Sequence, residues 1–332
     1  MTEADATALA CLASQAWPAI TIPPRLVMHR ENTVFQVDTT HGPHALRMHR
    51  FGYHNPATII SELQWMDMLA AQGFVVPSPL RSKAGSFLVT CDDANGQPRV
   101  FSLLSWLPGE AFGKSTEPLR FEGVQRTAIM SEIGRNLAQL HRLSDAWSPP
   151  LDFTRPAWDH AGLLGESPFW GRFWEAGYIT DTDRHFLLSL RATCQQALLR
   201  YDADTPETGL IHADLARENI LVDSTKVSFI DFDDSGFGYR MFDIATALIK
   251  NIYEPDYENL KQALLQGYLD VRPLAPNHMQ SLPLFMLLRS LTYLGWVDAR
   301  IAEPGMIEKA RRFLADVRYL ADTNSGQLRS LP

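Results

Sequence analysis

Residues 209–248, GLIHADLARENILVDSTKVSFIDFDDSGFGYRMFDIATAL, contain the features that decide both the fold and the expected chemistry. His212 and Asp214 follow a short apolar run, and Asn219 stands five residues after Asp214. The apolar runs ILV and VSFI are joined by the polar turn DSTK, which predicts a β-hairpin. Because a hairpin brings its two ends together, we expect Asn219 at its entry and Asp231 at its exit to be neighbours.

Two oxygen-bearing side chains at one end of a hairpin suit Mg²⁺, which shares its coordination with substrate phosphates. Asp214 lies just before that point, where it is placed to orient an attacking hydroxyl and accept its proton. This is the arrangement of a kinase catalytic loop, H-x-D-x-x-x-x-N, followed by a metal-binding Asp. We therefore predict Asp214 as the catalytic residue and Asn219 and Asp231 as metal ligands, with His212 supporting the loop. The alternative is a structural hairpin with incidental carboxylates.

The composition limits the other classes of protein. A chain of 332 residues is long enough for two lobes, and 45% hydrophobic with 20% charged residues is typical of soluble globular proteins. The net charge of −8 without a long basic run argues against nucleic-acid binding, and no apolar run reaches membrane-spanning length. Three widely spaced cysteines and a start without a basic segment favour the cytoplasm. The sequence does not indicate the oligomeric state.

The first third of the chain alternates in the way strands do. A short helix over 4–16 precedes strand-like runs in RLVMHRENTVFQVDTT and HALRMHR, and Asn55-Pro56 marks a helix start. Two further strands follow in SFLVT and RVFSLLSWL. This order is that of a kinase amino-terminal lobe, and Leu107-Pro108-Gly109 predicts the beginning of the linker.

The remainder has helical spacing, and the only clear strands expected there are those of the hairpin. We predict an α+β, bilobal, protein-kinase-like fold. Its small strand-rich amino-terminal lobe covers 1–105, and its larger, mostly helical carboxyl-terminal lobe covers 106–332. Expected helices include AIMSEIGRNLAQLHRL and residues 184–201, 257–270, 282–301 and 304–321.

Three features of the amino-terminal lobe indicate an ATP site. The loop HRENT at 29–33 lies where a kinase covers ATP phosphates, and Asn32 and Thr33 are expected to present backbone N–H groups and a hydroxyl. An ordinary hairpin turn is the alternative, since no G-x-G-x-x-G is present. Arg47 in ALRMHR is predicted to hold the α- and β-phosphates, with Glu62 of the next helix as its partner. The alternative is a surface Arg and a solvated Glu.

The third feature is the segment LLSWLPGE at 103–110. Its backbone is expected to meet the adenine edge, with Ser105, Trp106 and Leu107 at the hinge. The alternative for Trp106 is a structural role in the hydrophobic core.

On these residues, the chain resembles the aminoglycoside phosphotransferase and choline kinase superfamily, nearest the branch of type II homoserine kinases and stress-response kinase A. The strongest part is HADLARENILV with FIDFDDSGFGYRMFDIATAL, where Asp231 and Asp243-Ile244-Ala245 match the family's second motif. HRENTVFQV and GRNLAQLH are weaker parts, and the resemblance runs from about Arg25 to Leu320. It implies ATP, Mg²⁺ and a hydroxyl acceptor. Arg47 stands where most members have Lys.

A small-molecule acceptor is expected, because only eleven residues separate Asp231 from Asp243 and no A-P-E follows. Asp243 is expected to cap the next helix and to hold the catalytic loop, and Asp233 or Asp234 to reach the metal or an acceptor amine unless both are solvated. Aromatic and acidic residues of the second half either bind an acceptor ammonium or form core: Trp158, Asp159, Trp170, Trp174, Tyr293, Trp296 and Asp298. A protein Ser/Thr kinase and an inactive nucleotide-binding module remain as alternative functions.

Overall fold

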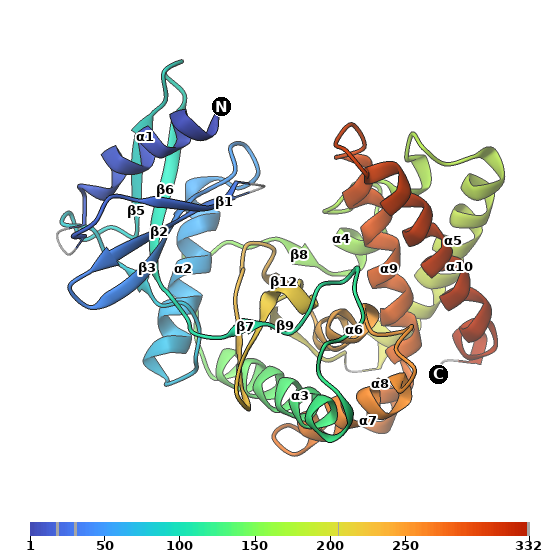
Figure 1. Ribbon diagram of the computed structural model, residues 1–332. Coiled ribbons are helices and arrows are strands. Elements are labelled where there is room, and N and C mark those ends of the chain that lie inside the picture. The colour runs from blue at the N-terminus through green and yellow to red at the C-terminus, as the bar shows by residue number, and fades with distance from the viewer. Residues whose placement is uncertain (18–19, 30–31, 205, 331–332) are drawn as a thin grey trace. The chain divides into compact units, whose positions relative to one another are not determined.

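The computed structural model describes residues 1–17, 20–29, 32–204 and 206–330, with side chains up to residue 324 (Figure 1). The chain forms two compact units. The first contains residues 1–109 together with 148–155, and the second contains 110–147 and the residues from 156 onward. The sequence offered no signal that 148–155 would join the first unit.

The first unit is built on an antiparallel sheet with strand order β1-β2-β3-β6-β4, in which β5 also pairs with β6. Each strand corresponds to an apolar alternation in the sequence, apart from the two-residue β4. The strands are β1 (Arg25–His29), β2 (Thr33–Thr39), β3 (Gly42–Met48), β4 (Pro79–Leu80), β5 (Leu88–Asp92) and β6 (Pro98–Ser105).

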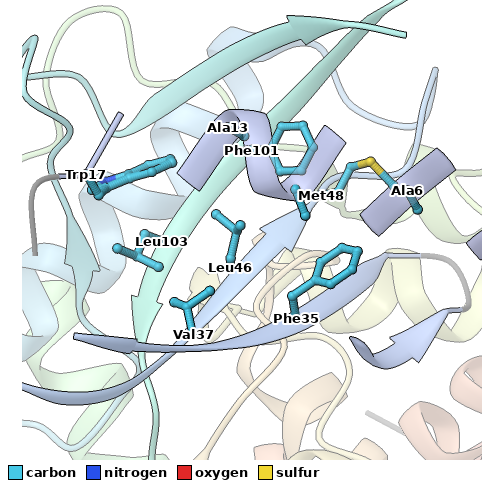
Figure 2. Close-up of a cluster of buried hydrophobic side chains, with 10 residues drawn as sticks. Ala6, Ala13, Trp17, Phe35, Val37, Leu46, Met48, Phe101 and Leu103 are labelled. Atoms are coloured by element: carbon cyan, nitrogen blue, oxygen red, sulfur yellow. The ribbon is translucent and has the colours of Figure 1, made fainter. Parts of the chain in front are cut away.

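Helix α1 (Glu3–Ser14) covers one face of this sheet, and Figure 2 shows the apolar side chains between them. Leu46 and Met48 of β3 point into that cluster and are buried. Because successive strand residues face opposite ways, Arg47 must point to the other face. Burial of Leu46 and Met48 therefore sets the direction of Arg47, the residue predicted to hold the nucleotide phosphates.

Helix α2 (Pro56–Ala71) begins and ends as its sequence predicts. The Asn55 side chain accepts a hydrogen bond from the Thr58 N–H, and Pro56 occupies the first turn. Gly73, with φ of 78°, follows the last turn, where a left-handed backbone favours glycine. This fixes the register of Glu62, which is fully buried in the middle of the helix.

The second unit is mostly helical and contains two three-stranded sheets. Figure 1 shows α9 beside α10. Helix α9 packs against both α10 and α6. The helices are α3 (Gly123–Asp145), α4 (His160–Leu164), α5 (Asp181–Ala203), α6 (Arg240–Ile249), α7 (Tyr257–Leu269), α8 (Pro276–Gln280), α9 (Leu282–Asp298) and α10 (Met306–Ser330), with 3₁₀ turns η1 (Phe173–Glu175) and η2 (Arg217–Asn219).

The strands of this unit are more numerous than predicted. The hairpin β10 (Ile220–Asp223) and β11 (Lys226–Phe229) pairs with β7 (Glu110–Ala111). A second sheet has the order β8-β12-β9. Its strands are β8 (Ala157–Trp158), β9 (Thr208–Ile211) and β12 (Gly236–Tyr239). The expectation that only the hairpin is extended here was therefore wrong.

Glycine explains why β12, with the sequence GFGY, was missed. A Cβ on Gly236 would lie 2.2 Å from the Pro156 carbonyl oxygen. A Cβ on Gly238 would lie 2.6 Å from Cδ1 of Ile211. Glycine is needed here because neighbouring chain segments approach closely, yet it removes the β-branched residues by which a strand is recognised.

The fold class is as predicted, α+β with a strand-rich first unit and a mostly helical second unit. No helix in the described part of the chain is long and apolar enough to cross a membrane.

Helices α3 and α7 approach each other closely at Gly134 of α3 and Gly267 of α7, and substitution of Gly134 tests this packing. A Cβ on Gly134 would lie 2.0 Å from the backbone oxygen of Leu264, so Gly134→Ala must push the helices apart. We expect it to lower the free energy of unfolding by about 1–3 kcal/mol, although alanine is the better helix former. Urea unfolding measures this, with Gln125→Ala on the exposed side of α3 as control. Equal stability of the two variants would contradict the close crossing.

Candidate active site

The hairpin joins the two predicted metal-binding segments. Its strands pair from Ile220 with Phe229 to Asp223 with Lys226, and the Ile230 N–H donates to the Asn219 carbonyl oxygen at 3.0 Å. Asn219 and Asp231 therefore lie at the same end of the hairpin, which confirms the predicted geometry. Their role as ligands is taken up below as a proposal.

His212 supports the catalytic segment as a neutral side chain. Its Nε2 lies 3.0 Å from the Ile230 carbonyl oxygen, and the Asp214 N–H lies 3.3 Å from its Nδ1. A carbonyl accepts and an N–H donates, so Nε2 carries the proton and Nδ1 is the acceptor. Burial lowers the pKa of His212 to about 3, which keeps the ring neutral. The residue links the segment before Asp214 to the end of the hairpin.

Asp243 holds the same segment from the other side. Its Oδ2 accepts from the His212 N–H at 2.8 Å, and its Oδ1 accepts from the Ala213 N–H at 2.6 Å. His141 Nε2 lies 3.1 Å from Oδ2, and Tyr268 lies 2.8 Å from the other ring nitrogen. Burial raises the pKa of Asp243 to about 7, while the backbone donors act in the opposite direction.

One expectation about Asp243 was wrong and the other is confirmed. Helix α6 begins at Arg240 with Tyr239 at its cap position, so Asp243 lies inside the first turn and does not cap the helix. It does hold the catalytic loop. The carboxylate is used by a loop 30 residues away in the sequence, which local capping rules do not consider.

The two functional segments share an unusual backbone. Ala213 has φ of 65° and Asp231 has φ of 64°, both in the left-handed region that side chains disfavour. Ser224, in the two-residue hairpin turn, is the third such non-glycine residue in the described ranges. Strain of this kind persists where surrounding contacts enforce it, and at Ala213 the Asp243 carboxylate is such a contact.

Both oxygens of Asp214 are engaged. Oδ1 lies 2.5 Å from Nη2 of Arg289, and Oδ2 accepts from Nδ2 of Asn219 at 2.9 Å. The same amide nitrogen donates to the Asp214 carbonyl at 2.8 Å. This fixes the amide of Asn219 so that its oxygen points away from Asp214 and is available to a cation.

Arg289, on α9, was missed in the sequence because its contact with Asp214 spans 75 residues. Its side chain is fully buried, and its guanidinium carbon lies 4.6 Å from the ring centre of Trp170 and 4.4 Å from that of Tyr293. Burial raises the pKa of Asp214, and the charges of Arg289 and then Lys250 oppose that rise. An apolar helix with a single Arg was the available signal.

The two residues predicted as metal ligands have side chains that would suit Mg²⁺. Asp231 is exposed at the hairpin end, and Asn219 presents its amide oxygen. Mg²⁺ needs one or two protein carboxylates when phosphate oxygens complete its shell. Over the described residues, no group of three or more His, Cys, Asp and Glu side chains is arranged to hold a metal. Asp234, by contrast, accepts from the Trp170 indole at 3.2 Å and belongs to the Arg289 surroundings.

In the first unit, the predicted pair of Arg47 and Glu62 is confirmed. Arg47 Nη2 lies 2.5 Å from Glu62 Oε1, and both side chains are buried. Arg155, which the sequence did not single out, lies 3.8 Å from the other Glu62 oxygen and donates to the Thr58 carbonyl. Glu62 thus faces two guanidinium groups, which excludes a solvated surface position.

The loop prediction is only partly testable, because residues 30–31 lie outside the described residues. Asn32 Oδ1 accepts from the Arg50 N–H at 2.9 Å, and the Thr33 hydroxyl contacts His29 Nδ1 at 2.9 Å. Both side chains are buried. The polar groups of these two side chains therefore stabilise the first unit.

The predicted hinge is formed by the end of β6. The Ser105 hydroxyl accepts from the Ser78 N–H at 2.8 Å, and the Trp106 N–H donates to the Pro43 carbonyl at 3.3 Å. Trp106 is 37% exposed, so the core alternative does not apply to it.

Most of the proposed ammonium-binding residues have structural roles. Trp158 and Trp174 are core side chains, Asp159 caps α4, and Asp298 accepts from the Gly177 N–H. Trp170 and Tyr293 do surround Asp214's partner Arg289. The core interpretation is thus correct for Trp158 and Trp174.

Arg217, inside the catalytic loop, was also missed. Its Nη2 lies 2.6 Å from Glu254, its Nε donates to Asn251, and its Nη1 donates to the Glu117 carbonyl at 2.7 Å. This buried ion pair fixes the 3₁₀ turn η2, whose last residue is Asn219. The sequence around it is the polar triplet Arg-Glu-Asn, which is common on exposed turns.

A strand-rich unit with a buried Arg–Glu pair and a helical unit with an Asp–Asn–Asp loop and hairpin define a kinase-like phosphotransferase. The model of the phosphotransferase enzyme family matches residues 25–280, and the chain belongs to this family. The resemblance identified in the sequence is confirmed.

Individual relatives extend over nearly the whole chain. Homoserine kinase of Xanthobacter autotrophicus is 27% identical and covers 90% of this chain and 88% of its own. A microcompartment-associated aminopropanol kinase is 28% identical, with a TM-score of 0.83 over 98% of this chain and 99% of its own. The amicoumacin kinase hAmiN, solved with AMP-PNP, Ca²⁺ and Ami, is 18% identical and shares the fold, with a TM-score of 0.75 over 95% and 94%. The chain is a small-molecule kinase.

The carboxylate of Asp243 can be tested by Asp243→Asn. The carboxylate of Asp243 accepts two backbone N–H groups, one on each oxygen. The amide of Asn has only one oxygen, and its NH₂ group would face the second backbone N–H. One buried donor therefore loses its acceptor. We expect a loss of about 1–3 kcal/mol in unfolding free energy and a fall in kcat of at least about tenfold. Thermal unfolding and steady-state rates measure both. Asp181→Asn, exposed in the first turn of α5, is the control and should change neither.

Proposed function

We propose that this kinase transfers the γ-phosphate of Mg-ATP to a hydroxyl of a small acceptor, either an amino alcohol, a homoserine-like amino acid or an aminoglycoside-like molecule. The single observation that supports this best is the position of Asp214. Its carboxylate lies 2.9 Å from the Asn219 amide, and Asn219 lies at the same hairpin end as Asp231. Family membership supports ATP as the donor.

The proposed division of work follows from each residue's contacts. Asp214 orients the acceptor hydroxyl and takes its proton as the oxygen attacks the phosphorus atom. Asn219 and Asp231 would hold Mg²⁺, which supplies charge neutralisation on the phosphate oxygens. His212 and Asp243 keep the segment rigid, so that Asp214 does not have to be oriented during the reaction.

Arg47 is proposed as the cation that holds the nucleotide phosphates, with Glu62 fixing its direction. Asn32, Thr33, Ser105, Trp106 and Leu107 are proposed nucleotide neighbours, mainly through their backbones. The guanidinium keeps its charge under all conditions and has a fixed fork of donors, so it replaces the usual Lys without loss of charge.

The acceptor class is supported by relatives whose names state small acceptors, homoserine and aminopropanol. The test is a phosphotransfer screen with Mg-ATP over amino alcohols, hydroxy amino acids, aminoglycosides, sugars and generic peptides. Turnover with one or more small acceptors is expected. Turnover with peptides alone, or ATP binding without any transfer, would overturn the proposal.

Asp214→Asn and Asp231→Ala should fail differently. The first removes the proton acceptor, so we expect kcat to fall by about 10²–10⁴-fold with Mg-ATP affinity nearly unchanged. The second removes a charged metal ligand and should weaken Mg-ATP binding as well. Isothermal titration with the non-hydrolysable nucleotide, beside steady-state rates, separates them. Glu117→Ala, an exposed acid, serves as the control, and normal nucleotide affinity in Asp231→Ala would contradict its assignment.

Arg47→Ala should raise the KM for ATP and lower kcat by about 10–100-fold, because a charge-assisted phosphate contact is lost. Arg47→Lys should retain much of the activity. Glu62→Ala should give a weaker defect of the same kind, and the double variant should be less than additive because the two side chains are in contact. Fully additive losses would show that the pair does not act together on the nucleotide.

A further inference from the structure

A cluster of two cations and three aromatic rings lies beside Asp214 in the second unit. Arg289 comes from the middle of α9, and Lys250 comes directly after α6. Lys250 Nζ lies 3.6 Å from the ring centre of Tyr293 and 4.2 Å from that of Phe313, while Arg289 lies over Tyr293 and Trp170. Both cations thus contact the ring of Tyr293.

These rings cannot serve as a vacant ammonium site. The electron-rich face of an aromatic ring attracts a cation, and Tyr293 already contacts two that belong to the protein. An acceptor ammonium placed there would be repelled by both. The favourable partner for this part of the site is therefore a negative or hydrogen-bond-accepting group.

Within the described residues, the two cations form few hydrogen bonds of normal geometry. Arg289 is fully buried and gives Nη2 to Asp214, but its Nε and Nη1 have no hydrogen-bond partner of normal geometry among the described residues. Lys250 has no carboxylate within 4.0 Å in the same part of the chain. Burial, followed by the charge of Arg289, lowers the pKa of Lys250 to about 7. A buried guanidinium with unused donors is unfavourable until an acceptor reaches it.

Several carboxylates of the protein lie near Arg289 and Lys250 and interact with them. Asp234 and Asp214 influence Arg289, and Asp316 and Glu218 influence Lys250 at longer range. Asp234 is held by Trp170, and Asp316 accepts from Tyr253. Each of these carboxylates therefore already has a donor elsewhere.

We propose that the acceptor has a carboxylate a few bonds from its reacting hydroxyl, and that Arg289 and Lys250 bind this carboxylate. The hydroxyl lies on Asp214, whose oxygen is 2.5 Å from the same guanidinium, so only a short molecule connects the two positions. The side chain of Asp214 is 23% exposed and gives the direction of entry. This inference rests on the proposed phosphotransfer to a small hydroxyl acceptor and selects hydroxy acids and hydroxy amino acids within it.

The experiment compares acceptors that differ by one group. Homoserine, 3-amino-1-propanol and 4-hydroxybutanoate share a hydroxyethyl end, and the second lacks the carboxylate whereas the third lacks the amine. Threonine with 1-amino-2-propanol, and serine with ethanolamine, repeat the comparison at other lengths. In at least one set, kcat/KM for the carboxylate-bearing molecule should exceed that of its decarboxylated partner by roughly 10²-fold or more.

The variants Lys250→Met and Lys250→Gln then test whether Lys250 causes the preference for carboxylate-bearing acceptors. Either variant should reduce the ratio between the paired acceptors by about ten- to a hundredfold, through the acceptor KM and without a change in the KM for ATP. Arg312→Met removes an exposed positive charge over the same Phe313 ring and should leave the ratio unchanged. Two replacements guard against one that fails to fold, and thermal unfolding checks both.

The outcomes distinguish this inference from the function on which it rests. Equal or better turnover of every decarboxylated partner overturns the inference while phosphotransfer stands. Turnover only with sugars or aminoglycosides also overturns it. A ratio unaffected by both Lys250 variants removes Lys250 from the site and overturns the pairing of the two cations. No transfer to any acceptor overturns the proposed function itself.

Discussion

The carboxylate of Asp243 is the contact on which the arrangement of the second unit depends. It accepts the backbone N–H groups of His212 and Ala213, and so fixes the segment that presents Asp214. His141 of α3 contacts this carboxylate with one ring nitrogen, and Tyr268 of α7 contacts the other ring nitrogen of His141. The close approach of α3 and α7 requires Gly134. A helix crossing far from the chemistry is therefore connected to the direction of the catalytic carboxylate. Loss of this buried acceptor would leave two N–H donors without partners, which lowers the free energy of unfolding.

Much of the fold and the centre of the site could be predicted because their signals are local. Three features depend on residues that are close in the sequence: the hairpin, the capped start of α2, and the alternation in β3. This alternation buries Leu46 on one face of the sheet and places Arg47 on the opposite face. The Arg47–Glu62 pair followed from the order of elements and is present. The catalytic and ligand roles of Asp214, Asn219 and Asp231 stay predictions.

What the sequence did not reveal depends on distant contacts. Arg289 and Arg217 reach their partners from 75 and 37 residues away. The apolar helix around Arg289 indicates burial, but no local pattern identifies the partner of either arginine. Strand β12 was missed because close approach of Pro156 requires glycine at 236, which weakens the strand pattern. For Asp243, the predicted hold on the catalytic loop is present, but the predicted helix cap is not, because α6 begins three residues earlier, at Arg240.

Arg47 and Arg289 show how burial separates two uses of the same side chain. Arg47 faces a fully buried Glu62 in the first unit, so its charge is compensated and its direction is fixed by the protein. Arg289 is also buried, yet its carboxylate partner Asp214 is the proposed proton acceptor, and Lys250 adds a second cation on the same Tyr293 ring. Positive charge beside Asp214 favours its ionised form, which burial alone would disfavour. The same positive charge disfavours an ammonium group beside Arg289. In the proposed mechanism, recognition of the acceptor and activation of its hydroxyl would therefore both depend on this guanidinium.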